Sequence, residues 1–323
     1  MLFRSQYEKL ILATGARERF LPFPGWTLPN VMGAGGLQAL VKGGLPIEGK
    51  RVVIAGSGPL LLAVGAYLQK RGAIVPLIAE QTGWSHLAGF GLAIASDPSK
   101  ALQGIALKWA LCGVPYMPAC WPVEAFGVDQ LTEVALTSKG KVWREPCDYL
   151  ACGFGLVPNL ELPLLLGCEV RNGVVAVNES QETSRAGIYC AGEPNGIGGV
   201  DLALIEGQIA GLAAADLGSR AKQMFRRRDR AARLRPVIDR AFALRDELRS
   251  LCAPDTVVCR CEDVTLERMK IHSGWRLAKL QTRCGMGPCQ GRICGPATEF
   301  LLGWKQESVR PPIFPVKLEH LTR

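Results

Sequence analysis

A glycine-rich turn between a strand-like segment and a helical one constrains the fold of this chain more than any other feature. Residues 51–55 form a largely apolar run typical of a buried strand, and Gly56-Ser57-Gly58 follows it directly. A helical segment comes next, and a second apolar segment then ends at Glu80. In a βαβ unit that binds a dinucleotide, glycines admit the pyrophosphate, the helix N-terminus attracts the anion, and the acid binds a ribose hydroxyl. The pattern therefore predicts such a unit over residues 50–80.

The match to this pattern is incomplete at two positions. Leu61 stands where the third glycine is expected, and Pro76 interrupts the strand that leads to Glu80. Without that glycine, the helix and the strand pack less closely. Two interpretations therefore stay open: an adenine nucleotide held by Gly56, Gly58 and Glu80, or a retained fold whose site is empty.

Strand-like and helical segments alternate along most of the chain, which predicts an α/β architecture with parallel sheets. With 323 residues, 48% hydrophobic and 21% charged, the chain suits a globular protein of two or three domains. No apolar run reaches the roughly eighteen residues of a membrane span. Residues 1–15 lack the pattern of a signal peptide, so we expect a cytoplasmic protein.

Cysteines are numerous for a cytoplasmic protein, and their distribution is uneven. Twelve cysteines in this compartment argue against a disulfide framework and for metal or redox chemistry. Six lie singly in apolar segments, where we expect small buried side chains: Cys112, Cys120, Cys147, Cys152, Cys168 and Cys190. Five others crowd into the last quarter of the chain: Cys259, Cys261, Cys284, Cys289 and Cys294.

The spacing of these five cysteines differs from that of most structural zinc sites, which pair ligands as C-x-x-C. Here the first pair is C-x-C and the last is C-x4-C, with glycines that free backbone amides to bind sulfur. A [2Fe-2S] cluster also needs four thiolates. A zinc site, an iron–sulfur cluster and a metal-free fold all stay open at this point.

Positive charge is concentrated between residues 219 and 251. This stretch has eleven Lys or Arg against four Asp or Glu, so it carries seven of the nine net positive charges. Apolar residues recur in it at helical spacing, which favours a solvated helix that links two domains. A docking face for an acidic partner or a membrane surface is the alternative. Nucleic acid is not expected as a partner, because no aromatic-interleaved basic platform accompanies the charge.

Three further segments resemble motifs of flavoproteins with two dinucleotide-binding domains. Residues 7–17, which contain Ala13-Thr14-Gly15, are similar to the first Ala-Thr-Gly segment of that superfamily, and residues 148–159 are similar to the second. Residues 187–193 resemble the late FAD motif. Glu193, where Asp is usual, and the following residues through Gly199 resemble the large subunit of bacterial amine and amino-acid dehydrogenases, the group of opine oxidase and hydrogen cyanide synthase.

This resemblance implies an FAD site and assigns residues to it. Glu193 would hydrogen-bond the ribityl chain, and the next helix would direct its positive end at the flavin. The residues implied at FAD are Thr14, Gly15, Gly192, Glu193, Gly196 and Ile197. In family members a strand and a full G-x-G-x-x-G turn precede the Ala-Thr-Gly segment. This sequence starts just before that segment, so we expect the first FAD pyrophosphate site to be absent from it.

The cysteine-rich segment resembles a known iron–sulfur domain. Residues 258–265 and 282–294 are similar to the small helical [2Fe-2S] domain related to bacterioferritin-associated ferredoxin, which ends the large subunits of this group. The family pattern implies Cys259, Cys261, Cys289 and Cys294 as ligands, with Cys284 at a variable position. Residues 310–316 look like the proline-rich tail of the family.

The resulting expectation is a Rossmann-like flavoprotein with a small helical C-terminal [2Fe-2S] domain. Its parts would be a partial FAD domain, an inserted NAD-like domain, a return to the FAD domain, a basic linker helix, and the [2Fe-2S] domain with its tail: residues 1–46, 47–147, 148–218, 219–255 and 256–323. The resemblance implies that a smaller FAD-containing, oxidase-type subunit oxidises the amine or amino-acid substrate. Electrons would then pass through this chain to an acceptor, often the respiratory chain, which makes peripheral contact with the inner membrane a further expectation. A non-catalytic electron-transfer or assembly module and an NAD(P)H-dependent oxidoreductase are the alternatives.

Overall fold

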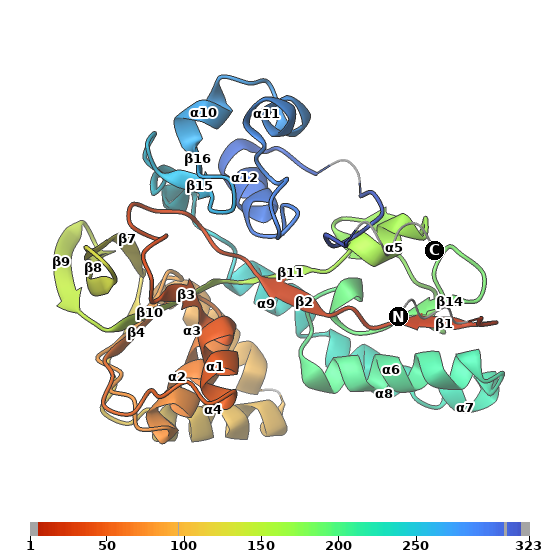
Figure 1. The fold of residues 1–323 in the computed structure, drawn as a ribbon. Coiled ribbons are helices and arrows are strands. Elements are labelled where there is room, and N and C mark those ends of the chain that lie inside the picture. Colours follow the sequence, from red (N-terminus) through yellow and green to blue (C-terminus); the bar gives the residue numbers. More distant parts are fainter. Residues whose placement is uncertain (1–5, 96, 307–308, 318–323) are drawn as a thin grey trace. The chain divides into compact units, whose positions relative to one another are not determined.

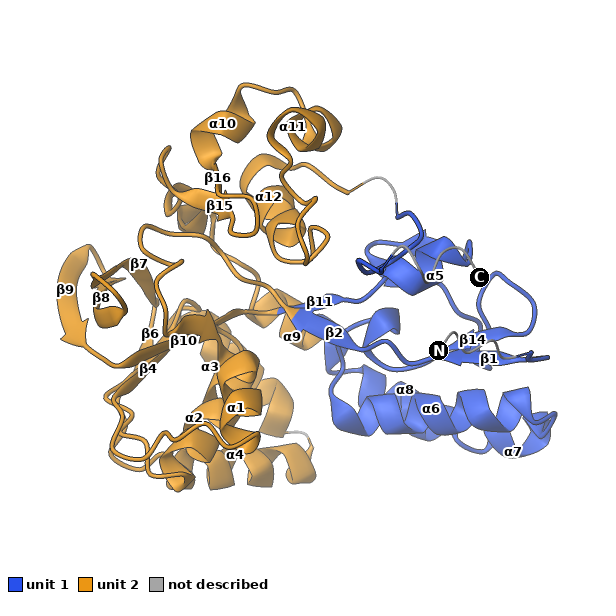
Figure 2. Cartoon of the chain, viewed as in Figure 1, with its two compact units in different colours: residues 1–17, 156–236, 307–323 blue, residues 18–155, 237–306 orange. Residues whose placement is uncertain are grey.

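The computed structural model describes residues 6–95, 97–306 and 309–317 (Figure 1). The end of the expected C-terminal domain, residues 318–323, lies outside this range. The chain forms two compact units, and each is built from separate stretches of sequence (Figure 2). Unit 1 contains residues 1–17, 156–236 and 307–323, and unit 2 contains residues 18–155 and 237–306.

Unit 1 is organised around two short parallel strands, β1 (Leu10–Leu12) and β14 (Ile188–Cys190). Helix α6 (Val200–Ala214) contacts both strands, as Figure 1 shows. Three smaller elements complete its core, namely α5 (Glu161–Leu165) and the antiparallel pair β12 (Val170–Arg171) and β13 (Val174–Val175). Strands β2 (Ala16–Glu18) and β11 (Leu156–Pro158) pair where the chain leaves unit 1 and returns to it.

Unit 2 contains the predicted βαβ unit within a parallel sheet of five strands. The strand order is β3 (Val31–Gly33), β10 (Tyr149–Phe154), β4 (Val52–Ser57), β5 (Ile78–Glu80) and β6 (Tyr116–Pro118). All six residues of β4 are buried, which explains its continuous apolar sequence. The helices of this part are α1 (Ala34–Lys42), α2 (Leu60–Lys70), α3 (Trp84–Ala95) and α4 (Pro98–Ala110). The α/β architecture with a parallel sheet is confirmed.

An antiparallel sheet and a helical segment complete unit 2. The sheet contains β7 (Cys120–Gly127), β8 (Leu131–Ser138) and β9 (Lys141–Pro146). The cysteine-rich segment has its own buried cluster, and its elements are β15 (Val257–Cys259), β16 (Val264–Thr265), α10 (Leu266–Lys270), α11 (Trp275–Thr282) and α12 (Cys294–Leu302).

The basic stretch is not one linker helix. It folds as α7 (Gly218–Lys222), α8 (Phe225–Ala232), α9 (Arg235–Ala241) and the 3-10 turn η2 (Asp246–Ser250). The break between α8 and α9 falls at residues 233–234, and Pro236, the second residue of α9, has no N–H to donate to the preceding turn. Within the described residues, no helix combines the length and the apolar character that crossing a membrane requires.

The observed units differ from the expected domains in their boundaries. Residues 148–155 were expected in the returning FAD domain, but β10 pairs with β4 and belongs to unit 2. Residues 309–317 group with unit 1 instead of with the cysteine-rich segment.

Candidate functional site

Unit 1 contains a cavity of about 360 Å³ at the carboxyl ends of β1 and β14. Small residues line most of it, and Glu193 contributes a carboxylate. Val200, the first residue of α6, is also part of the lining, so the N-terminus of this helix opens at the cavity. The partial positive charge of a helix N-terminus favours a negatively charged group there.

Glycines give this cavity its shape. Gly192 and Gly199, which flank the loop between β14 and α6, have φ angles of 82° and 80°, a region that favours glycine. Of the residues that sequence assigned to FAD, Gly15, Gly192 and Glu193 line the cavity.

Three other assigned residues lie at different positions. The Thr14 hydroxyl donates to the Asn159 carbonyl at 2.7 Å, and the Asn159 amide donates to the Thr14 carbonyl at 2.8 Å. Thr14 therefore joins two segments of unit 1. Gly196 faces the Arg235 side chain, and Ile197 is not among the lining residues of this cavity.

A buried ion pair beside this cavity was not predicted from sequence. Glu206 of α6 is only 2% exposed, and it accepts hydrogen bonds from the Gly192 N–H and the Arg235 guanidinium, both at 2.8 Å. Burial raises the pKa of Glu206, and Arg235 is the first of the groups that lower it. Burial likewise raises the pKa of Glu193, and Arg235 opposes that shift. A run of arginines in the sequence gives no signal that one of them turns inward.

The glycine turn of unit 2 brings Gly56, Gly58 and Glu80 together, as the sequence predicted. The Glu80 side chain is fully buried, and its oxygens accept from the N–H groups of Gly58 at 2.8 Å and Thr82 at 2.9 Å. The Tyr116 hydroxyl donates to it at 3.4 Å. Burial raises the pKa of Glu80. The carboxylate oxygens are therefore engaged by the chain itself.

Residues 242–243 contact the carboxyl ends of β4 and β5. The Ser57 hydroxyl donates to the Phe242 carbonyl at 3.3 Å, and the Gln81 amide donates to the Ala243 carbonyl at 3.2 Å. In open α/β sheets a ligand binds at this edge. Here the carbonyl groups of residues 242–243 lie at this edge and accept hydrogen bonds from the two strand ends.

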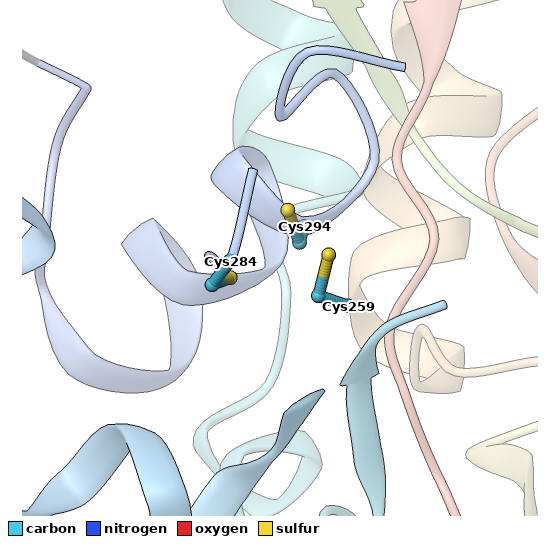
Figure 3. A group of neighbouring side chains, drawn as sticks. All are labelled: Cys259, Cys284 and Cys294. Atoms are coloured by element: carbon cyan, nitrogen blue, oxygen red, sulfur yellow. The ribbon is translucent and has the colours of Figure 1, made fainter. Parts of the chain in front are cut away.

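The cysteine group lies in the small helical segment of unit 2 (Figure 3). Cys259 ends β15, Cys284 follows α11, and Cys294 begins α12. Their three buried sulfur atoms lie within 4.8 Å of one another. Cys289 extends the group, because its thiol hydrogen-bonds with those of Cys294 and Cys261.

Glycines in the loop between α11 and α12 allow this close approach. A Cβ atom on Gly287 would lie 2.3 Å from the Cβ of Cys261, and a Cβ on Gly285 would lie 2.8 Å from the Trp275 ring. The Gly285 N–H also points at the Cys259 sulfur, at 3.5 Å. Backbone amides that face sulfur are a feature of iron–sulfur sites.

The electrostatics of the group favour thiolates at two positions. Hydrogen bonds from Cys284 and Cys294 lower the pKa of Cys259 to about 2, and a hydrogen bond from Cys294 lowers that of Cys289 to about 5. Metals are bound by the thiolate form of cysteine. This donor set fits a [2Fe-2S] cluster, which is held by four cysteine thiolates.

The isolated cysteines follow the sequence expectation with one exception. Five of the six are buried, but Cys112 is exposed and is not a core residue. It lies in the turn that follows α4, a helix that has no fully buried residue.

Comparisons with known proteins agree with this architecture. Residues 2–207 match the pyridine nucleotide-disulphide oxidoreductase family. The HcnB chain of hydrogen cyanide synthase from Pseudomonas aeruginosa is 35% identical over 91% of this chain and 69% of its own length. An opine oxidase subunit from Rhizobium meliloti strain 1021 is 31% identical over 98% of this chain and 76% of its own length.

Among solved structures, L-proline dehydrogenase from P. horikoshii has the same fold, with a TM-score of 0.62 and 19% identity. The match covers 98% of this chain and 58% of that one. The resemblance inferred from sequence motifs is thereby confirmed. This chain belongs to the pyridine nucleotide-disulphide oxidoreductase family, in the group that contains HcnB of hydrogen cyanide synthase and the matching subunits of opine oxidase.

Proposed function

We propose that this chain is the electron-transferring subunit of an FAD- and [2Fe-2S]-dependent dehydrogenase that acts on an amine or an amino-acid-derived substrate. The group of cysteine thiols in the small helical segment carries the proposal, because a flavoprotein fold alone fits many activities. The named relatives are subunits of hydrogen cyanide synthase and of opine oxidase, which supports an assembly of more than one chain.

The proposed division of labour separates oxidation of the substrate from electron transfer. A substrate with hydrogen on the carbon next to nitrogen loses two electrons and two protons to become an imine. We place that step on a smaller FAD-containing partner subunit. When bound, FAD exchanges two electrons and a [2Fe-2S] cluster exchanges one, so the two together pass electrons from that partner to an acceptor.

At the flavin, residues of this chain bind and orient. Gly15 and Gly192 leave room for the cofactor, Glu193 offers a carboxylate to a hydroxyl group, and the N-terminus of α6 favours negative charge. Thr14 fixes the segment that carries Gly15 through its bonds with Asn159. Gly196 and Ile197 shape the loop that leads to α6.

For the cluster we propose Cys259, Cys261, Cys289 and Cys294 as ligands. Cys289 supports this set because its thiol contacts those of Cys261 and Cys294, so one segment supplies C-x-C and the other supplies C-x4-C. Cys284 competes for a place, since its sulfur lies within 4.8 Å of those of Cys259 and Cys294.

A matched pair of variants decides between the two sets. We expect Cys284→Ala to keep the visible absorbance of the cluster and Cys261→Ala to lose it. Loss in Cys284→Ala with retention in Cys261→Ala would assign the fourth ligand to Cys284. A colourless protein that carries zinc would contradict the iron–sulfur proposal itself.

For the glycine turn of unit 2 we propose a structural role without a bound nucleotide. The contacts of Glu80 with Gly58 and Thr82, and of residues 242–243 with Ser57 and Gln81, support this proposal. Titration of the purified protein with NADH, followed by fluorescence, tests it. Saturable binding of NADH that Glu80→Ala abolishes would show that this turn binds a nucleotide.

The activity is tested by assay of the complex. We expect reduction of a dye by opine, glycine, proline or hydroxyproline substrates only when the smaller flavin subunit is present. Turnover by this chain alone would contradict the proposed division of labour. A cytoplasmic location is part of the proposal, with the exposed arginines of α8, such as Arg226 and Arg227, available to an acidic partner or a membrane surface.

A further inference from the structure

One arginine of the basic stretch lies against the glycine loop of the flavin cavity instead of in solvent. The Arg235 side chain is 21% exposed and forms an ion pair with Glu206 at 2.8 Å. A Cβ atom on Gly196 would lie 3.6 Å from its guanidinium carbon, and one on Gly198 would lie 2.9 Å from its Nε. The guanidinium therefore passes directly beside residues 196–198.

The ion pair is linked to the wall of the cavity through Glu206. One carboxylate oxygen of Glu206 accepts from Arg235, and the other accepts from the Gly192 N–H at 2.8 Å. Gly192 lines the cavity and begins the turn that carries Glu193. Arg235, Glu206 and Gly192 thus form a continuous polar connection from α9 to the cavity wall.

Charge explains why an arginine is needed at this position. Glu206 is almost completely buried, and a buried carboxylate without a partner is costly. Without a cation it would be protonated, and it would then hold the Gly192 N–H less firmly. The Nε of Arg235 is buried and has no hydrogen-bond partner among the described atoms. Its one carboxylate partner, Glu206, therefore satisfies only some of the donors of the guanidinium.

We infer that Arg235 is a positioning residue of the flavin site: acting through Glu206, it holds residues 192–199 in the shape that receives the flavin. This inference rests on the proposed function and adds a residue to it. It also accounts for glycine at 198, where a Cβ atom would lie 2.9 Å from the Nε of Arg235.

The alternative is that the Arg235–Glu206 pair stabilises unit 1 without shaping the cavity. A double variant distinguishes these two interpretations. Arg235→Gln leaves Glu206 buried without its cation and destabilises the protein on either reading. Arg235→Gln combined with Glu206→Gln removes both charges, so stability recovers, but the loop stays without its support.

The experiment uses the protein as purified. We compare wild type, Arg235→Gln, Arg235→Lys, the double variant, and Arg233→Gln, which changes an exposed arginine two residues away. Flavin affinity is measured by fluorescence, the loop by hydrogen exchange of residues 190–200, and stability by thermal unfolding.

We expect the double variant to unfold near the wild-type temperature but to bind flavin about tenfold or more weakly, about 1.4 kcal/mol. Its loop should exchange faster than that of wild type, Arg235→Lys should recover part of the affinity, and Arg233→Gln should match wild type. Wild-type flavin affinity together with wild-type loop exchange in the double variant would overturn the inference. If wild type holds neither flavin nor an iron–sulfur cluster, the proposed function fails, whereas the exchange of residues 190–200 still decides whether Arg235 holds the loop.

Discussion

Gly56 offers a direct test of what the glycine turn of unit 2 does. Its φ angle is 140°, and it pairs with Gly153 of the adjacent strand β10. A Cβ atom at this position would lie 1.9 Å from the Gly153 carbonyl oxygen and 2.5 Å from its carbonyl carbon. Both atoms belong to the backbone of a central strand, so they cannot move aside without disturbing the sheet.

The expected cost of Gly56→Ala has two parts. A non-glycine residue at positive φ costs about 1–2 kcal/mol, and overpacking in a rigid interior costs about 1–3 kcal/mol. The sum of about 2–5 kcal/mol is large compared with a typical total stability of about 5–15 kcal/mol. For a unit of this size it corresponds to a fall in melting temperature of about 4–20 °C.

The assay is thermal and urea unfolding followed by circular dichroism, without added nucleotide. Gly104→Ala is the matched control, because Gly104 lies within α4 and a Cβ there would have no atom within 4 Å. Alanine in that helix should raise stability by about 0.5–1 kcal/mol. A Gly56→Ala protein as stable as wild type would refute the reasoning that this glycine serves strand packing.

Three further substitutions test the sites. Cys259→Ser should abolish the visible absorbance of the cluster, since Cys259 belongs to both candidate ligand sets. Glu193→Ala should lower the ratio of flavin to protein after gel filtration, because it removes the carboxylate that lines the cavity. Glu18→Ala should lower stability by about 1–3 kcal/mol in urea, because it removes the acceptor of the Gly35 and Gly36 N–H groups at the start of α1.

Each of these substitutions has a result that would count against it. An unchanged spectrum in Cys259→Ser would remove the residue from the ligand set, and flavin retention equal to wild type would exclude Glu193 from the site. An unchanged urea midpoint in Glu18→Ala would mean that water replaces the carboxylate at no cost. Lys139→Ala, at a turn between β8 and β9, is a suitable surface control.

The sequence predicted the βαβ unit well because its signals are local. A continuous apolar run, two glycines and a following helix specify β4 and α2 within a few residues. The strand that ends at Glu80 is shorter than the apolar segment before it, because β5 begins at Ile78, after Pro76, which cannot donate to a ladder.

The cysteine group was also predictable, because closely spaced cysteines need little tertiary information to meet. The position of Cys284 beside Cys259 was not, since it depends on how the loop after α11 packs on Trp275. Arg235 and Glu206 lie 29 residues apart on different helices, and only the fold brings them together. The prediction of a single basic helix is wrong, because apolar residues at helical spacing do not show where a helix ends, and Pro236 interrupts the stretch.

The most direct test of the account is anaerobic purification followed by iron, acid-labile sulfide and zinc analysis and by electron paramagnetic resonance of the reduced protein. We predict iron and sulfide in equal amounts, little zinc, and a resonance typical of a reduced [2Fe-2S] cluster. Protein that contains neither iron nor acid-labile sulfide, or that contains zinc in their place, would contradict the claim that this chain transfers electrons through a [2Fe-2S] cluster.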